Sequence, residues 1–198
     1  MGRHKKSRGR NVTKQRLKSF SRREFTMNEV MKNILTRRSV RKFSNQPVEK
    51  EIIEDIVKAG LYAPSAMNRQ TWKFTVVTNQ EKIKTLCEAV GKELGRSGYD
   101  MYQPTLLIIP SNHRETVWGR EDNACALENM FLAAHSYGVG SVWINQMQGL
   151  CDKPEIRAVL DEFGIPAEHV VYGVASMGYP AEPVTDEKER IGEVAYIE

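Results

Sequence analysis

The residues best suited to chemistry form two short clusters in the first half of the chain. In the first cluster, three guanidinium groups and one hydroxyl lie within five positions, as Arg37, Arg38, Ser39 and Arg41. Arginine offers a planar, permanently charged donor fork that matches the oxygens of a dianionic phosphate. This cluster is therefore a candidate phosphate site, and a solvated basic turn is the alternative interpretation.

The second cluster lies about 25 residues further along the chain, in a loop that begins with proline. It carries a hydroxyl, two side-chain amides and a final indole, in the order Pro64, Ser65, Ala66, Met67, Asn68, Arg69, Gln70, Thr71, Trp72. Amide donors and acceptors match the carbonyls and ring nitrogens at the edge of a flat heterocycle. The loop is therefore a candidate heterocycle-binding loop, or a polar connection that ends in a core tryptophan.

Side chains that usually act as nucleophile or general base form no recognisable pattern. The chain lacks the GxSxG, GxxxxGK(S/T) and HExxH signatures. Its four histidines and three cysteines are scattered, without metal-ligand spacing. Gly138 and Gly140 follow a predicted helix and lack the third glycine of a dinucleotide-binding fingerprint. If the protein is an enzyme, we expect a cofactor to carry the reaction.

Hydrophobic periodicity predicts the elements that position these clusters. Helices are expected near 28–35, 49–62, 80–94, 121–137 and 153–163, the fourth of them central because it is apolar on nearly all sides. Strands are expected at 74–78, 105–109 (ended by Pro110), 141–144, 169–177 and 194–197. This pattern predicts an α+β fold with a mixed sheet flanked by helices.

Charge divides the chain into two parts. Residues 1–26 hold ten Lys/Arg and one acid, a charge of +9, so with a total of +4 the remainder carries −5. A basic segment poor in aliphatic residues does not offset the entropy of ordering. We therefore expect 1–26 to be a flexible leader and 27–198 to be the folded domain. An arm that binds nucleic acid or an anionic membrane is the alternative for the leader, although we expect no specific nucleic-acid partner.

The sequence also predicts where the protein works. It contains no apolar run of about 18 residues, so we expect neither a transmembrane helix nor a membrane partner. The basic start is not followed by the apolar region of a signal peptide. Because the cysteines are scattered, reduced thiols in the cytoplasm are the simplest interpretation.

Four stretches, taken in order, resemble the motifs of the nitroreductase family over about residues 29–198. The arginine cluster resembles the family's R/K-R-S-x-R phosphate motif, and the loop resembles its P-S-x-x-N-x-Q-P-W motif. The third stretch is Glu128-Asn129-Met130 with the run 138–144, and the fourth is 178–180 with the basic pair of 188–190. Each motif is weak alone, but four in the family's order are specific.

The resemblance implies a mainly antiparallel sheet, a homodimer with two FMN molecules at the subunit interface, and exchange of a C-terminal strand. The residues that it implies for the FMN phosphate and ribityl chain are Arg37, Arg38, Ser39 and Arg41. Those that it implies for the isoalloxazine are Pro64, Ser65, Ala66 and Asn68, with Gln70 nearby. Ile144, Asn145 and Gln146 match the stretch beside flavin N5, and Lys188 and Arg190 match a late basic pair. A physical hint of strand exchange is the apolar run 194–197, because such a tail can pair with the sheet edge of a neighbour.

By the same resemblance, the protein would transfer hydride from NADH or NADPH to a small electron-poor acceptor, such as a nitroaromatic or quinone, by ping-pong kinetics. A dehalogenase or flavin-fragmenting enzyme of the same fold, and a non-enzymatic FMN- or nucleic-acid-binding module, are the alternatives. The sequence departs from the family pattern at Thr71, where proline is common, and at Asn145, where some members have glutamate. The hypothesis requires that the arginine cluster and the amide-bearing loop converge on one FMN.

Overall fold

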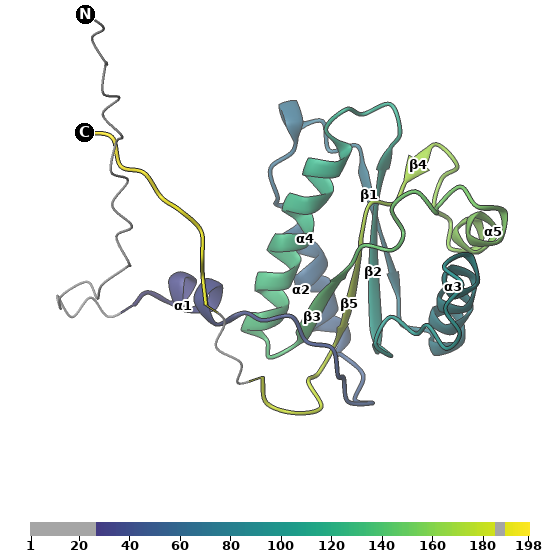
Figure 1. Cartoon of the computed structure of the whole chain (residues 1–198), viewed down its shortest axis with the longest axis horizontal. Helices are drawn as coiled ribbons and strands as arrows, with labels where there is room; N and C mark the ends of the chain where they lie inside the picture. The colour runs from purple at the N-terminus through teal and green to yellow at the C-terminus, as the bar shows by residue number, and fades with distance from the viewer. Residues whose placement is uncertain (1–26, 185–188) are drawn as a thin grey trace, which may run out of the picture.

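A five-stranded sheet forms the middle layer of the protein, with helices on both of its faces (Figure 1). The structure is a computed structural model that describes residues 27–184 and 189–198, so the predicted leader 1–26 and Lys188 lie outside the described residues. The strands are β1 (Trp72–Val77), β2 (Leu106–His113), β3 (Gly140–Ile144), β4 (His169–Val170) and β5 (Val174–Gly178). The helices are α1 (Glu29–Thr36), α2 (Lys50–Leu61), α3 (Gln80–Glu93), α4 (Gly119–Ser136), α5 (Pro154–Glu162) and the short 3-10 helix η1 (Ala66–Asn68).

The sheet has the order β1-β2-β5-β3, and β4 pairs with the far end of β2. All of these strand pairs are antiparallel. The α+β class and the mainly antiparallel sheet are therefore confirmed. None of the helices in the described ranges is long and apolar enough to cross a bilayer.

A β-bulge corrects two of the predicted strand boundaries. Against β2, Val170 pairs with Asn112 and Ala175 pairs with Ile108, so the four residues 171–174 lie opposite the three residues 109–111. The extra residue splits the predicted strand 169–177 into β4 and β5. Pro110 lies opposite the residues between β4 and β5, where no strand residue pairs with β2 on that side. Proline lacks a backbone N–H, but no hydrogen bond is lost at this point. β2 therefore continues through Pro110 to His113.

The predicted strand 194–197 is also not formed in the single chain. Residues 189–198 are exposed, and they have no strand assignment. A strand requires a neighbour that pairs with its backbone N–H and C=O groups. Exchange of this segment between two chains stays a prediction.

Two hydrophobic layers hold the sheet between the helices. β2 alternates between them: Leu106 and Ile108 face the layer of α2 and α4, whereas Leu107 and Ile109 face the layer of α3 and α5. This alternation explains why β2 is continuously apolar, because both faces of the strand are buried. The expectation that the fourth helix is central is confirmed, since α4 packs against α2, α1 and three strands.

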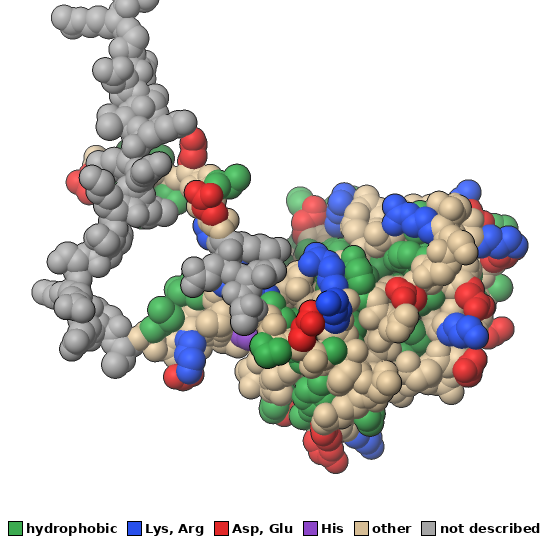
Figure 2. Space-filling view, turned by 60° about the horizontal axis from the view of Figure 1, so that its bottom comes forward, with side chains coloured by type: hydrophobic (Ala, Val, Ile, Leu, Met, Phe, Trp, Pro, Cys, Tyr) green, Lys and Arg blue, Asp and Glu red, His purple; other side chains and the backbone are tan. Residues whose placement is uncertain are grey.

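Helix α1 stands apart from these layers (Figure 1). Asn28 caps its start by accepting a hydrogen bond from the backbone N–H of Met31 (2.8 Å). Its link to the body includes the side-chain amide of Asn33, which donates to the carbonyl of Leu132 on α4 (2.8 Å). None of its residues is buried, and Figure 2 shows hydrophobic side chains on the part of the chain that projects from the body.

Candidate functional site

The arginine segment (residues 37–41) follows α1 and runs along the C-terminal half of α4. Arg37 is half-buried, and its Nε lies 3.8 Å from Oε1 of Glu128 on α4. Arg38 folds back on the chain, where Nη1 donates to the carbonyls of Leu35 (2.6 Å) and Arg37 (2.8 Å). Arg41 is exposed, with its guanidinium carbon 5.9 Å from the ring centre of Tyr102. The three cations therefore have different environments.

The start of β3 fixes the backbone of this segment. Ser39 forms a parallel bridge with Ser141, and the N–H of Val40 donates to the Ser141 carbonyl (3.0 Å). Gly140 permits this approach, because a Cβ there would lie only 2.7 Å from a Val40 methyl group. A larger residue at position 140 would displace the segment that carries the predicted phosphate ligands.

His135 on α4 reports the electrostatics of the segment. Its Nε2 shares a hydrogen bond with Oγ1 of Thr36 (2.8 Å). Burial lowers the pKa of His135 below 6.5, and the nearby charges of Arg37 and Arg38 lower this pKa further. The two guanidinium groups therefore add to burial in disfavouring a further positive charge at this position.

The amide loop (residues 64–70) has a strained backbone. Three of its non-glycine residues adopt the left-handed region, with φ of 52° at Met67, 54° at Asn68 and 50° at Gln70. Such conformations cost about 1–3 kcal/mol each and cluster at active sites and ligand clamps. Within the loop, the N–H of Gln70 donates to Oγ of Ser65 (3.2 Å) and its side chain donates to that of Asn68 (2.8 Å). The strain presents both amides to solvent in a defined arrangement.

Asp122, in the first turn of α4, holds the base of this loop. It is only 4% exposed, and its Oδ1 accepts the backbone N–H of Ala66 (2.9 Å). The sequence analysis missed this residue, because a buried carboxylate next to a helix start looks like an ordinary acidic first turn. The available signal was its place in the first turn of α4, three residues after Gly119. Helical side chains tilt toward the N-terminus, so a side chain at this position reaches back over the start of the helix.

Thr71 closes the loop with a polar network. Its hydroxyl donates to Oδ1 of the buried Asn112 (2.7 Å) and lies 3.3 Å from Oγ1 of Thr116. Proline, which is common at this position in the family, could not make these bonds. The hydrogen bonds of Thr71 therefore take over the task of fixing the end of the loop.

Trp72 then starts β1 and stacks on Phe74 with ring centres 5.5 Å apart, as expected for a core tryptophan.

The third group of predicted residues follows β3. Ile144 is buried in the core, Asn145 is exposed and Gln146 is half-buried. Gln148, two residues further on, accepts a hydrogen bond from Arg120 in the first turn of α4 (3.2 Å). This group therefore lies toward the end of α4 that holds the amide loop. Of the late basic pair, Arg190 is exposed on the C-terminal tail.

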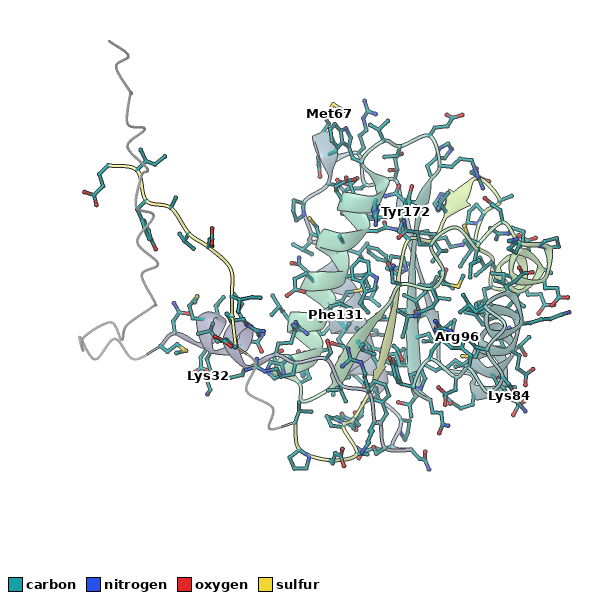
Figure 3. The ribbon with its side chains drawn as sticks, in the orientation of Figure 1. Lys32, Met67, Lys84, Arg96, Phe131 and Tyr172 are labelled. Carbon is teal, nitrogen blue, oxygen red and sulfur yellow. The ribbon has the colours of Figure 1, made fainter. Side chains whose placement is uncertain are left out.

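The arginine segment and the amide loop lie toward opposite ends of α4. The loop contacts Asp122 in its first turn, whereas Thr36, just before the segment, contacts His135 in its last turn. Thirteen helical residues span roughly 20 Å. Figure 3 shows Met67 at one end of α4 and Lys32 of α1 at the other. The expectation that the two clusters converge is wrong for one chain, and it stays a prediction for two chains together.

A cleft of about 1140 Å³ opens elsewhere, between α2, α3 and the loop 98–105. None of the residues predicted to bind FMN lines it. It contains Cys87, but burial raises the pKa of this thiol to about 12, so it is not a nucleophile at neutral pH. Apart from the buried Ile144, the candidate cofactor residues in the described ranges are instead exposed or half-buried on the surface of the single chain.

Sequence comparison supports one family for this fold and site. The profile of the nitroreductase family matches residues 34–103 and 96–179, which include the arginine segment, the amide loop and 144–146. An Archaeoglobus fulgidus protein with the provisional name NADH dehydrogenase/NAD(P)H nitroreductase is 38% identical over 162 residues, 79% of this chain and 88% of that protein. The NADPH-flavin oxidoreductase of Vibrio harveyi is 32% identical over 72% of this chain and 66% of its own.

Solved structures agree. A nitroreductase with bound FMN from Bacteroides fragilis superposes with a TM-score of 0.79 at 36% identity, covering 86% of this chain and all of that one. An FMN-dependent nitroreductase from Clostridium difficile gives 0.67 at 31% identity, covering 79% and 91%. The chain belongs to the nitroreductase family, as its motifs had indicated.

Proposed function

We propose that the protein is an FMN-dependent oxidoreductase that takes hydride from NADH or NADPH and passes it to a small electron-poor acceptor, such as a nitroaromatic or quinone. The single observation that carries this proposal is the exposed pair of surfaces, one rich in arginine and one rich in strained amides, on a nitroreductase fold. Related proteins are named as a nitroreductase with bound FMN, an FMN-dependent nitroreductase and an NADPH-flavin oxidoreductase. FMN, when bound, supplies the redox chemistry that the side chains lack.

The active form that we propose is a homodimer in which each FMN site combines two chains. The arginine segment of one chain would face the amide loop of its partner, because the two surfaces lie too far apart within one chain. The exposed apolar face of α1 supports a second copy: Val30, Met31, Ile34 and Leu35 are 43–68% exposed. The tail supports it too, since Ile191, Val194, Tyr196 and Ile197 are 75–97% exposed.

At the phosphate end, we assign binding to Arg37, Arg38, Ser39 and Arg41, assisted by Lys188 and Arg190 from the tail. The residues present fit a dianion, because three guanidinium groups and a hydroxyl lie within five positions. Burial lowers the pKa of His135 beside them, and the charges of Arg37 and Arg38 lower it further. Ser39 would donate its hydroxyl, and its backbone is held in place by β3. These residues bind and orient the cofactor, and they transfer no proton.

At the ring end, we assign contacts to Pro64, Ser65, Ala66, Asn68 and Gln70, with residues 144–146 beside them. The fit rests on the amides of Asn68 and Gln70, which are exposed and held by a backbone that Asp122 anchors. Amides can both donate to and accept from a heterocycle edge. An anchored loop loses little entropy on binding, so it would hold a bound flavin ring in one orientation.

One slot for both substrates would give ping-pong kinetics, because NAD(P)H must leave before the acceptor enters. The apolar side chains Met67 and Trp118 are 70% and 48% exposed near the amide loop, and they are candidate walls of that slot. Their role would be to stack on flat substrates and to exclude water. The cytoplasmic location of the enzyme stays a prediction.

The visible spectrum of the purified protein tests the cofactor assignment. We expect yellow protein with flavin absorbance, and NAD(P)H oxidation with nitrofurazone or menadione that gives parallel double-reciprocal lines. The double substitution Arg37→Ala and Ser39→Ala should raise the FMN dissociation constant by about 100-fold or more, because charge-assisted hydrogen bonds contribute about 1.5–3 kcal/mol each.

The matched control is Lys84→Ala with Thr85→Ala. It removes the same kinds of group from exposed positions on α3, across the sheet from α4 (Figure 3). This control should bind FMN like the wild type. Wild-type protein that stays colourless with excess FMN, or equal FMN affinity in both double variants, would reject the assignment.

A further inference from the structure

Buried polar side chains concentrate beneath the amide loop, around the start of α4. Three of the six buried polar or charged residues in the described ranges lie there, as Asn112, Asp122 and Asn123, and Asp122 is the only acid among the six. Two of their atoms, Oδ2 of Asp122 and Nδ2 of Asn123, are buried without a hydrogen-bond partner among the described residues. Because such groups destabilise a fold, a cluster of them points to a task other than stability.

The cluster contacts the first turn of the amide loop through Asp122. Oδ1 of Asp122 accepts the backbone N–H of Ala66 (2.9 Å), and the carbonyl of Ala66 accepts the N–H of Arg69 (3.1 Å). A hydrogen bond from an N–H to a carboxylate is stronger than one between neutral groups. One strong bond therefore ties the short helix η1, which contains the strained Met67 and Asn68, to the start of α4.

Asn112 contacts the other end of the loop. It is fully buried on β2, and its Oδ1 accepts the hydroxyl of Thr71 (2.7 Å) and the N–H of His113 (2.9 Å). Its Nδ2 donates to the carbonyl of Gly119 (3.5 Å) and to Oδ1 of Asn123 (3.3 Å). These four bonds use the full hydrogen-bonding capacity of the amide. Asn112 therefore joins the end of the loop to β2 and α4 at one point.

The strained part of the loop lies between these two attachments. Of the six non-glycine residues with a left-handed backbone in the described ranges, three lie between residues 66 and 71, and the other three are Met101, Tyr102 and Gln103 in a separate turn. A left-handed backbone at such residues persists only where the surrounding structure enforces it. The hydrogen bonds at Ala66 and Thr71 supply this enforcement from two central elements of the fold, α4 and β2.

We propose that Asp122 and Asn112 are positioning residues for the flavin ring, which hold the amide loop at both ends so that Asn68 and Gln70 keep the arrangement that the ring binds. This inference rests on the proposed function. Both residues are buried beneath the loop, so neither needs to touch the cofactor. A loop that is already ordered loses little entropy when the ring binds.

Two substitutions release the two ends of the loop separately. Asp122→Ala should weaken binding of FMN and of riboflavin by the same factor, about 10- to 100-fold, because the two flavins share the ring and riboflavin lacks only the phosphate. Thr71→Val should weaken both by about two- to tenfold, since it removes a neutral hydrogen bond. Thr71 is changed in place of Asn112, because Asn112 also holds β2 and α4 together. Flavin fluorescence quenching measures these dissociation constants.

Three controls separate positioning from general damage to the fold. Asp122→Asn keeps an acceptor oxygen for the Ala66 N–H and should retain most of the flavin affinity. Thr75→Val on β1 is the matched control for Thr71→Val, because the Thr75 hydroxyl is buried without a partner among the described residues. Leu160→Ala on α5, in the other hydrophobic layer, should lower thermal stability but leave flavin binding by the folded protein unchanged.

Amide hydrogen exchange of the apoprotein measures the state of the loop without any cofactor. Peptides that cover residues 64–71 should exchange faster in Asp122→Ala and in Thr71→Val than in the wild type, because each variant frees one end of the strained backbone. Peptides from α3 should keep the wild-type rate. In Asp122→Asn the loop should exchange nearly as slowly as in the wild type.

The outcomes separate this inference from the proposed function. If the wild type binds FMN but Asp122→Ala and Thr71→Val bind both flavins normally, the positioning role is wrong and the function stands. The role is also wrong if Leu160→Ala loses as much flavin affinity, or if only FMN binding falls and riboflavin binding is spared. If the wild type binds no flavin, the proposed function fails and the positioning role fails with it, whatever the exchange rate of the loop.

Discussion

Helices α1 and α4 both carry many apolar side chains, but they use them differently. In α4, eight residues are buried, and the helix is covered by α2 on one side and by the sheet on the other. In α1, the apolar residues share one face and none is buried. The apolar face of α1 therefore has no covering layer within the described chain. In our proposal a second copy of the chain covers it.

The same contrast links assembly to chemistry. The arginine segment directly follows α1, whereas the amide loop is anchored to the opposite end of α4 by Asp122. If α1 packs against a partner chain, the arginine segment that follows it also lies against the partner. Formation of the dimer and completion of the FMN site are therefore one event in our account.

The largest expected effect is on the buried helix. Leu127→Ala in α4 should lower the free energy of unfolding by about 2–5 kcal/mol, because it leaves a cavity in a fully buried layer. Leu35→Ala in α1 should change it by less than about 1 kcal/mol in dilute monomer, since this side chain is already exposed. Urea titrations of both variants measure the difference. Equal losses in dilute monomer would show that α1 is core after all.

The next effect is on assembly. Ile34→Glu places a charge on the exposed face of α1 and should raise the dimer dissociation constant by about 30-fold or more, which corresponds to about 2 kcal/mol. FMN should be lost in parallel. Lys32→Glu, on the same helix but charged in the wild type, is the control. Sedimentation velocity with detection at the flavin wavelength measures both, and a yellow Ile34→Glu dimer would contradict the link between assembly and cofactor.

Truncation after residue 190 should have a smaller effect on the same equilibrium. It removes the four exposed apolar side chains of the tail, which we expect to contact the partner. The dimer dissociation constant should therefore rise. The free energy of unfolding of the monomer should not change, because the tail is exposed in the single chain. Size-exclusion chromatography over a range of concentrations measures this. A truncated protein that stays as dimeric as the full chain would remove the tail from the interface.

The smallest expected effect concerns pH. The pKa of His135 is lowered in the folded protein, so below about pH 6.5 the unfolded chain binds more protons and stability falls. His135→Gln should therefore show a shallower loss of stability between about pH 7.5 and 5.5, measured by urea midpoints. Part of the slope should remain, because burial also lowers the pKa of His169. An unchanged slope would mean that the pKa of His135 is not lowered in the folded protein.

Local patterns in the sequence were sufficient to predict the elements. Five helices and the strands β1, β2 and β3 lie close to their predicted positions, because periodicity and apolar runs report burial directly. The bulge that divides β4 from β5 was not predictable, since it depends on register against β2. Pro110 misled the prediction for the same reason, because its missing N–H matters only where a neighbour needs it.

The candidate site was predictable as a set of residues but not as an arrangement. The motifs identified the arginine segment and the amide loop one by one. Their separation along α4 follows from tertiary packing, which no short motif encodes. The strain at Met67 and Tyr102 was equally invisible, because both residue types usually avoid the left-handed region and only the surrounding contacts enforce it.

Complementation between two inactive variants tests the shared site most directly. One variant carries Arg37→Ala and Ser39→Ala, and the other carries Asn68→Ala and Gln70→Ala, so each alone should be colourless as a homodimer. After the two are mixed and the subunits exchanged, half of the dimers combine both variants and each of these has one intact site. We predict that about one quarter of the FMN sites and of the NAD(P)H oxidation return. Heterodimers that stay colourless and inactive would show that each chain binds FMN with its own residues alone, and would contradict the account.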